Sequence, residues 1–199
     1  VLVAAREVPR RSPAGPEGRI ALLHALAHIE LNAIDLAVDI VGRFAGAPDL
    51  AGVEASFATD WLAVAAEEAG HFLMLADRLE ALGSSYGALP AHDGLWQTAL
   101  ATRGDLLGRL ALAPLTHEAR GLDVTPGLIA KLQGAGDRDS ARILGVIYRD
   151  EIGHVATGQR WFAHVCAQRK IEPEAAFPAA LERIGLARPH PPFNQAARR

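Results

Sequence analysis

The stretch at 67–72, which reads EEAGHF, and the stretch at 150–155, which reads DEIGHV, each place a glutamate three residues before a histidine. Apolar residues recur around both stretches at three- and four-residue spacings, so both are predicted to lie in the middle of helices. Residues three apart share one helix face, and each motif can therefore present a carboxylate and an imidazole to one point. A single Glu-x-x-His motif is common by chance and more typical of an exposed polar face. Two copies among apolar neighbours favour a buried site.

Two further predicted helices each carry one glutamate in an apolar setting, Glu30 after Leu26 and Glu118 after Leu115. The order along the chain is thus Glu, Glu-x-x-His, Glu, Glu-x-x-His, with one element per helix. Four carboxylates that converge in a core repel one another, and each is costly to remove from water. Two divalent cations would cancel the four charges; the alternative is a helical protein whose polar face shows this order by chance. We predict a dimetal site with the ligands Glu30, Glu68, His71, Glu118, Glu151 and His154.

The apolar periodicity and the positions of glycine and proline predict an all-α fold. Long helices are expected over 19–44, 53–82, 95–119 and 138–169. Pro114 should kink the third long helix or force a bulge in it, and Gly121 should end it. Thr125 and Pro126 predict an N-cap and first residue of a short helix to about Leu132. A second short helix is expected over 172–184.

Composition fits one globular domain, expected at 19–184, between an extended lead-in (1–18) and an extended tail (185–199). Half of the 199 residues are hydrophobic and 22% are charged, as in an ordinary soluble protein. A single cysteine, Cys166, excludes an internal disulfide and a cysteine-based zinc or iron–sulfur site. The same cysteine count fits a reducing compartment, so we expect a cytoplasmic protein.

The charge distribution argues against a nucleic-acid binder and against a membrane protein. The formal net charge is −3, whereas a general nucleic-acid binder is usually basic. The most apolar stretch, 20–41, carries Glu30, Asp35 and Asp39, so it is not expected to span a membrane. No basic segment followed by an apolar run indicates a signal peptide. Because the sequence starts at Val1 and not at a methionine, an N-terminal segment that precedes it is one of the alternatives.

Several runs resemble known proteins. Residues 24–30, 90–96, 118–127 and 149–155 resemble the most recognisable runs of an uncharacterised bacterial family, domain of unknown function 455, and the likeness covers about 19–194. The ligand order resembles that of the ferritin-like superfamily. The resemblance implies a ferritin-like four-helix bundle with additional short helices and extended termini. Members of the domain of unknown function 455 family are similar in outline to the di-iron tRNA hydroxylase. Mixed carboxylate and imidazole ligation favours two iron ions, with manganese or a mixed pair as alternatives.

The same resemblance implies roles for residues around the ligands. A ligating histidine usually donates its other N–H to a carboxylate or carbonyl. In related di-iron proteins the acid before each ligand glutamate pairs with the histidine of the opposite motif. That implies contacts of Glu67 with His154 and of Asp150 with His71. Tyr148, one turn before Glu151, could serve a redox role, although core packing is the more common use of a buried tyrosine.

The function that these features favour is activation of dioxygen by a di-iron enzyme that oxidises or hydroxylates an organic substrate. The expected partners are dioxygen, an electron donor, and a small-molecule or modified-nucleoside substrate, in a monomer or small homo-oligomer. The alternative is a ferroxidase or iron-storage protein without an organic substrate, and a third possibility is a scaffold that keeps the metal for stability alone. His92, Asp93 and Trp96 are the nearest candidates for choosing the substrate.

Overall fold

The computed structural model describes residues 1–9, 11–186 and 189–198, and these form an all-helical protein, as predicted. The α-helices are α1 (Pro16–Phe44), α2 (Glu54–Ala81), α3 (Gly94–Ala101), α4 (Leu106–Leu112), α5 (Ala119–Gly134), α6 (Arg138–Arg169) and α7 (Pro173–Arg183). Short 3-10 turns, η1 (Ala5–Glu7) and η2 (Pro48–Leu50), and a π-helical turn, η3 (Ala113–Glu118), complete the helical elements of this part of the chain.

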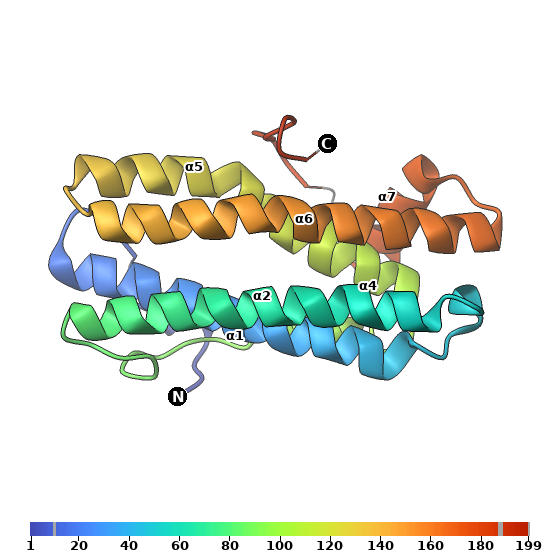
Figure 1. Cartoon of the computed structure of the whole chain (residues 1–199), viewed down its shortest axis with the longest axis horizontal. Helices are drawn as coiled ribbons and strands as arrows, with labels where there is room; N and C mark the ends of the chain where they lie inside the picture. Colours follow the sequence, from blue (N-terminus) through green and yellow to red (C-terminus); the bar gives the residue numbers. More distant parts are fainter. Residues whose placement is uncertain (10, 187–188, 199) are drawn as a thin grey trace.

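The long helices lie side by side with their axes roughly parallel (Figure 1). Helix α1 packs along α2, helix α5 packs along α6, and α2 and α6 join the two pairs. Helices α4, η3 and α5 follow one another along the remaining side and take the place of the third long helix. A connection over 82–93 leads from the end of α2 back across α1 to α3.

Helix boundaries in the regular part follow local signals. Pro16 occupies the first turn of α1, where its missing N–H costs nothing. Asp137 caps α6 by accepting hydrogen bonds from the backbone N–H and the hydroxyl of Ser140, at 3.0 and 2.8 Å. At the other end Lys170 adopts a left-handed conformation, with φ 55°, which stops the helix. Helix α6 therefore has the predicted bounds.

The prediction of a continuous helix over 95–119 was wrong. Helix α3 ends at Ala101, and Asp105 begins α4 by accepting from the backbone N–H of Gly108. The break is held by Arg109, whose side chain is completely buried. Its guanidinium donates to the Thr102 hydroxyl at 2.6 Å and to the Asp39 carboxylate on α1 at 2.6 Å. A contact 70 residues away in the sequence thus stabilises a turn that Gly104 and the capping residue Asp105 also favour locally.

Pro114 forces a bulge, as predicted, because it lacks the N–H that would close a normal helical turn. The bulge is the π turn over Ala113–Glu118, and the hydroxyl of Thr116 donates to the carbonyl of Ala111 at 2.8 Å. The Pro114 ring lies against Gly158 of α6, where a Cβ atom would overlap it. Gly158 is therefore required for the close approach of the two helices.

Gly121 does not end the helix and Thr125 does not begin one, contrary to prediction, since α5 continues through both. Pro126 lies inside α5 and cannot donate to the carbonyl of Leu122, one turn earlier. The side-chain amide of Asn194 donates to that carbonyl instead, at 3.2 Å. The described part of the tail thus folds back over α5 and is not simply extended, although residues 187, 188 and 199 lie outside the described residues.

Two large apolar clusters lie toward the two ends of the long helices, and a third, small one contains Leu122 and Val155. One includes Phe57, Trp61, Leu110 and Phe162; the other includes Leu23, Leu75, Leu79, Leu132 and Leu144. On α1, α2 and α6 the glutamates of interest fall between the two clusters along the sequence. A polar centre is therefore enclosed by apolar packing on both sides.

Helix α1 is long and apolar enough to cross a membrane by length and composition alone. However, 61% of its most apolar window is buried inside the protein, as in the core helix of a soluble protein.

Candidate metal centre

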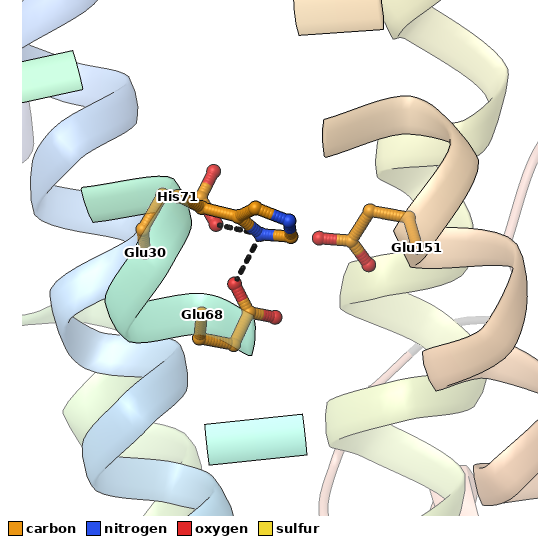
Figure 2. A group of neighbouring side chains, drawn as sticks. All are labelled: Glu30, Glu68, His71 and Glu151. Atoms are coloured by element: carbon orange, nitrogen blue, oxygen red, sulfur yellow. Dashed lines mark hydrogen bonds and ion pairs between the residues drawn. The ribbon is translucent and has the colours of Figure 1, made fainter. Parts of the chain in front are cut away.

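The side chains predicted as metal ligands come together in the middle of the molecule. They form two overlapping groups, in each of which the candidate ligand atoms lie within 4.8 Å of one another. The first group is Glu30, Glu68, His71 and Glu151, shown in Figure 2, and the second is Glu118, Glu151 and His154. Glu30 comes from α1, Glu118 from the end of η3, and the others from α2 and α6. We call these six residues the Glu/His cluster.

Two carboxylates connect the two ends of the cluster. Glu68 has one oxygen 3.1 Å from Nδ1 of His71 and the other 3.0 Å from Nδ1 of His154. Glu151 belongs to both groups. Each end also has one glutamate that the other end does not share, Glu30 at the His71 end and Glu118 at the His154 end. The arrangement offers two adjacent groups, each with one imidazole and one carboxylate of its own; they share Glu151, and Glu68 of the first group also contacts His154 of the second.

The imidazoles are held by acids from the opposite helix. Nε2 of His71 lies 3.1 Å from the Asp150 carboxylate, and Nε2 of His154 lies 2.8 Å from the Glu67 carboxylate. These are the pairs that the resemblance implied. Such contacts fix the ring orientation and leave Nδ1 of each ring directed into the cluster.

Tyr148 is engaged elsewhere. Its hydroxyl accepts a hydrogen bond of 2.8 Å from the side-chain amide of Asn194, and its ring packs against the small apolar group that contains Leu122 and Val155. The structure therefore gives Tyr148 the core packing that was expected to be its more common use, together with a contact to the tail.

Several buried atoms of the cluster have no hydrogen-bond partner among the described residues. These are one oxygen each of Glu30, Glu118 and Glu151, whereas the second oxygen of Glu68 and Nδ1 of His154 face only each other, 3.0 Å apart. Most buried polar atoms in proteins are paired, so unpaired ones need an explanation. Here they are all lone-pair donors to a cation, and they are gathered at one place. The residues present therefore fit a pair of metal ions.

Without metal, the cluster holds protons. Burial raises the pKa of Glu30, Glu118 and Glu151. Burial also opposes ionisation of Glu68, but hydrogen bonds with His154 and His71 lower its pKa below the usual value. Although burial favours neutral rings, contacts with the glutamates raise the pKa of His71 to about 10 and the pKa of His154 to about 12. Metal binding must displace these protons.

A cavity of about 480 Å³ lies beside the cluster. Its lining includes Glu30, Glu118 and Glu151, and among the described residues it includes neither Glu68 nor the two cluster histidines. The cluster is thus closed on its histidine side and open on its carboxylate side.

The connection over 82–93 forms one wall of the cavity and is fastened to α1. Nδ1 of His28 lies 2.8 Å from the Tyr86 hydroxyl, and Nε2 of His28 lies 3.0 Å from the carbonyl of His92. Nε2 of His24 accepts from the backbone N–H of Gly87. The histidines of α1 that precede Glu30 therefore position this wall.

Of the residues expected to choose the substrate, His92 lines the cavity, whereas Asp93 and Trp96 are not part of its lining. Sequence reasoning missed Arg11, His117, Arg120 and Gly121, which do line it. Gly121 stands three residues after Glu118, so helical spacing from that glutamate could have indicated it, whereas Arg120, two residues after Glu118, does not share its face on a regular helix.

The fold and site define an all-helical protein with a buried glutamate and histidine cluster that can hold metal. The whole chain, residues 1–199, matches the family described as "Protein of unknown function (DUF455)", and the chain belongs to this family. It is 44% identical over 187 residues to an uncharacterized protein of Haemophilus influenzae, an alignment that covers 94% of this chain and 65% of that protein. The chain thus spans slightly less than two thirds of its relative. No solved structure matched the chain.

Proposed function

We propose that the chain is a ferritin-like four-helix bundle that binds two iron ions and activates dioxygen to oxidise or hydroxylate an organic substrate. The observation that supports this most is the pair of overlapping ligand groups, which share Glu151 and are bridged by Glu68. Unpaired buried atoms at the same place strengthen it.

In this proposal each residue has a defined task. Glu30 and His71 would hold one ion, Glu118 and His154 would hold the other, and Glu68 and Glu151 would contact both. Asp150 and Glu67 keep the imidazoles oriented, with Nδ1 inward. Two ferrous ions bound there would supply electrons for the reduction of dioxygen. The apolar clusters exclude water from both ends of the Glu/His cluster, and its carboxylates remain accessible from the cavity.

Charge and ligand type support iron or manganese. Four carboxylates and two divalent ions form a neutral set, which removes the repulsion that the buried carboxylates would otherwise suffer. Oxygen and imidazole donors suit iron and manganese better than copper. We further propose a monomer or small oligomer in the cytoplasm, supplied with electrons by a separate donor, whose organic substrate enters through the cavity.

The test is an anaerobic titration with ferrous iron, followed by exposure to air with an oxygen electrode. Wild-type protein should take up about two irons per chain and consume dioxygen. A Glu151→Gln variant, which keeps the side-chain shape, should do neither. Retention of hundreds of iron atoms per chain in a large hollow shell would replace this proposal with iron storage.

A further inference from the structure

The cavity beside the Glu/His cluster has walls suited to an apolar molecule. Helix α1 contributes Ala25, Ile29 and Ala33, and α5 contributes Val124 and Leu128. Ile29 and Val124, which are 39% and 40% exposed, both line the cavity. An apolar occupant of the cavity would contact both side chains.

Small residues keep the space open. Ala21, Ala25 and Ala33 line it from α1, and Gly121 lines it from α5. A Cβ atom at Gly121 would meet no other atom within 4 Å. A larger side chain could therefore be added at this position, where it would extend into space that is otherwise open, without forcing the helices apart.

The charged groups of the lining are divided between two sides. The acidic residues are Glu30, Glu118 and Glu151, all from the cluster. The guanidinium groups are those of Arg11, which is exposed, and Arg120, whose side chain is 49% exposed. The cavity thus has carboxylates on its inner side and positive charge on its solvent side.

Most of the N–H donors of the Arg120 guanidinium make no hydrogen bond within the described residues. One of its terminal nitrogens makes two long contacts, 3.4 Å to the Asp123 carboxylate and 3.3 Å to the carbonyl of Pro192. Its other N–H groups have no partner in the part of the chain that the structure describes. A guanidinium with unused donors is well suited to a carboxylate or phosphate group.

We infer that this cavity binds a small amphipathic organic anion, with its apolar body between α1 and α5 and its negatively charged group at Arg11 and Arg120. The inference rests on the proposed function in treating this molecule as the substrate. Its apolar end lies toward the cluster, because the carboxylates there attract no anion and the arginines on the solvent side do. The position presented to the cluster is therefore a carbon of the apolar part.

The probes that test this are decanoate, decan-1-ol and decyltrimethylammonium, which share an apolar chain and differ in head-group charge. Each is titrated by calorimetry into the full chain, both metal-free and loaded with iron under anaerobic conditions. Decanoate should bind saturably, and the alcohol and the cation should bind about tenfold more weakly or worse.

Two variants distinguish the contribution of the arginine charges to binding from the contribution of the apolar space. The double variant Arg11→Gln, Arg120→Gln should weaken decanoate about tenfold and leave the alcohol unchanged. Gly121→Phe should abolish binding of decanoate, while circular dichroism and metal content remain those of the wild type. Gly127→Phe is the matched control, because Gly127 is on the same helix, is also unobstructed, and does not line the cavity.

Equal affinity for the three probes, or unchanged decanoate binding by Gly121→Phe, would overturn the inference. Failure of the proposed function has a different signature. In that case the iron titration of the same samples shows no bound metal, while the ligand titration of the metal-free chain still decides whether the cavity selects an amphipathic anion.

Discussion

The two sides of the molecule hold the Glu/His cluster in different ways. Helices α2 and α6, which carry the two Glu-x-x-His motifs, are uninterrupted over 28 and 32 residues. The opposite side, from α3 to α5, is broken at 102–105, bulged over Ala113–Glu118 and carries Pro126 within a helix. We call these the regular side and the irregular side. The regular side supplies four of the six ligand residues, α1 supplies Glu30, and the irregular side supplies Glu118 and a wall of the cavity.

The difference shows two routes to a buried ligand. On α2 and α6, helical spacing alone places each carboxylate beside its imidazole. Glu118 instead closes a π turn, which inserts one extra residue into the helix and rotates everything beyond it by about 100°. Its direction therefore depends on Pro114 and on the close packing of Pro114 against Gly158. Regular helices fix the closed side of the cluster, and the irregular segment sets its open side.

The largest expected effect is on metal content, when substitution of the shared carboxylate Glu151 is compared with substitution of Glu118, which belongs to one ligand group only. Glu151→Gln, on the regular side, should abolish binding of both metal ions, because Glu151 belongs to both ligand groups. Glu118→Gln should abolish one. Metal content measured by mass spectrometry after anaerobic loading and desalting distinguishes the two results. Both metal-free variants should be as stable as the wild type or more so, because each lacks a buried carboxyl. Two metal equivalents in both variants would refute the dimetal assignment.

The next effect concerns the packing that positions the irregular side. Gly158→Ala should destabilise the protein by about 1–3 kcal/mol, because the added methyl group overlaps the rigid Pro114 ring. Gly145→Ala, on the same helix, should stabilise it by about 0.4–1 kcal/mol, since its Cβ meets little and alanine restricts the unfolded chain. Urea denaturation at neutral pH measures both. If the two substitutions have the same sign, the close approach at Pro114 is not what holds α6 against η3.

The regular side could be predicted from the sequence almost completely. The bounds of α6 match the prediction, those of α2 differ by one residue at each end, and the motif spacing places Glu68, His71, Glu151 and His154 together. That these side chains bind metal stays a prediction. Their grouping could be predicted because it depends on helical periodicity and on apolar neighbours, and both can be read from the sequence.

The irregular side could not be predicted, because distant contacts override local signals there. The turn at 102–105 is held by Arg109 and Asp39, which are 70 residues apart. Pro126 would normally begin or break a helix, but Asn194, 72 residues after Leu122, donates to the Leu122 carbonyl that Pro126 leaves without its usual helical partner. No property of the sequence near Pro126 indicates that a donor from the tail is available.

A double-mutant cycle tests that replacement of a hydrogen bond. Asn194→Ala should cost about 1–2 kcal/mol, because it removes donors to the Leu122 carbonyl and to the Tyr148 hydroxyl. In a Pro126→Ala background the backbone N–H of residue 126 can bond the Leu122 carbonyl, so Asn194→Ala should cost less there. The expected coupling is about 0.5–1 kcal/mol, obtained from the four free energies of unfolding. Additive costs would show that Asn194 acts through its contacts with Tyr148 and Ala197 and not through the Leu122 carbonyl.

The smallest effect is expected on the regular side, at the contact between Arg169 at the end of α6 and Asp49 between α1 and α2. The guanidinium donates twice to this carboxylate, at 3.1 and 2.6 Å, and this holds the pKa of Asp49 below its usual value. A lowered pKa means that the contact stabilises the folded chain above the unfolded pKa of about 3.9 and loses this contribution as the pH falls through the lower, folded value. Because both groups are partly exposed, the contribution should be only about 0.5 kcal/mol. Urea unfolding of wild type and Asp49→Asn should therefore differ by this amount at pH 7 and converge toward pH 2, and 1 M salt should shrink the difference at pH 7. A difference that grew on acidification would mean that Asp49 is stabilised in its protonated form, which the two donated hydrogen bonds exclude.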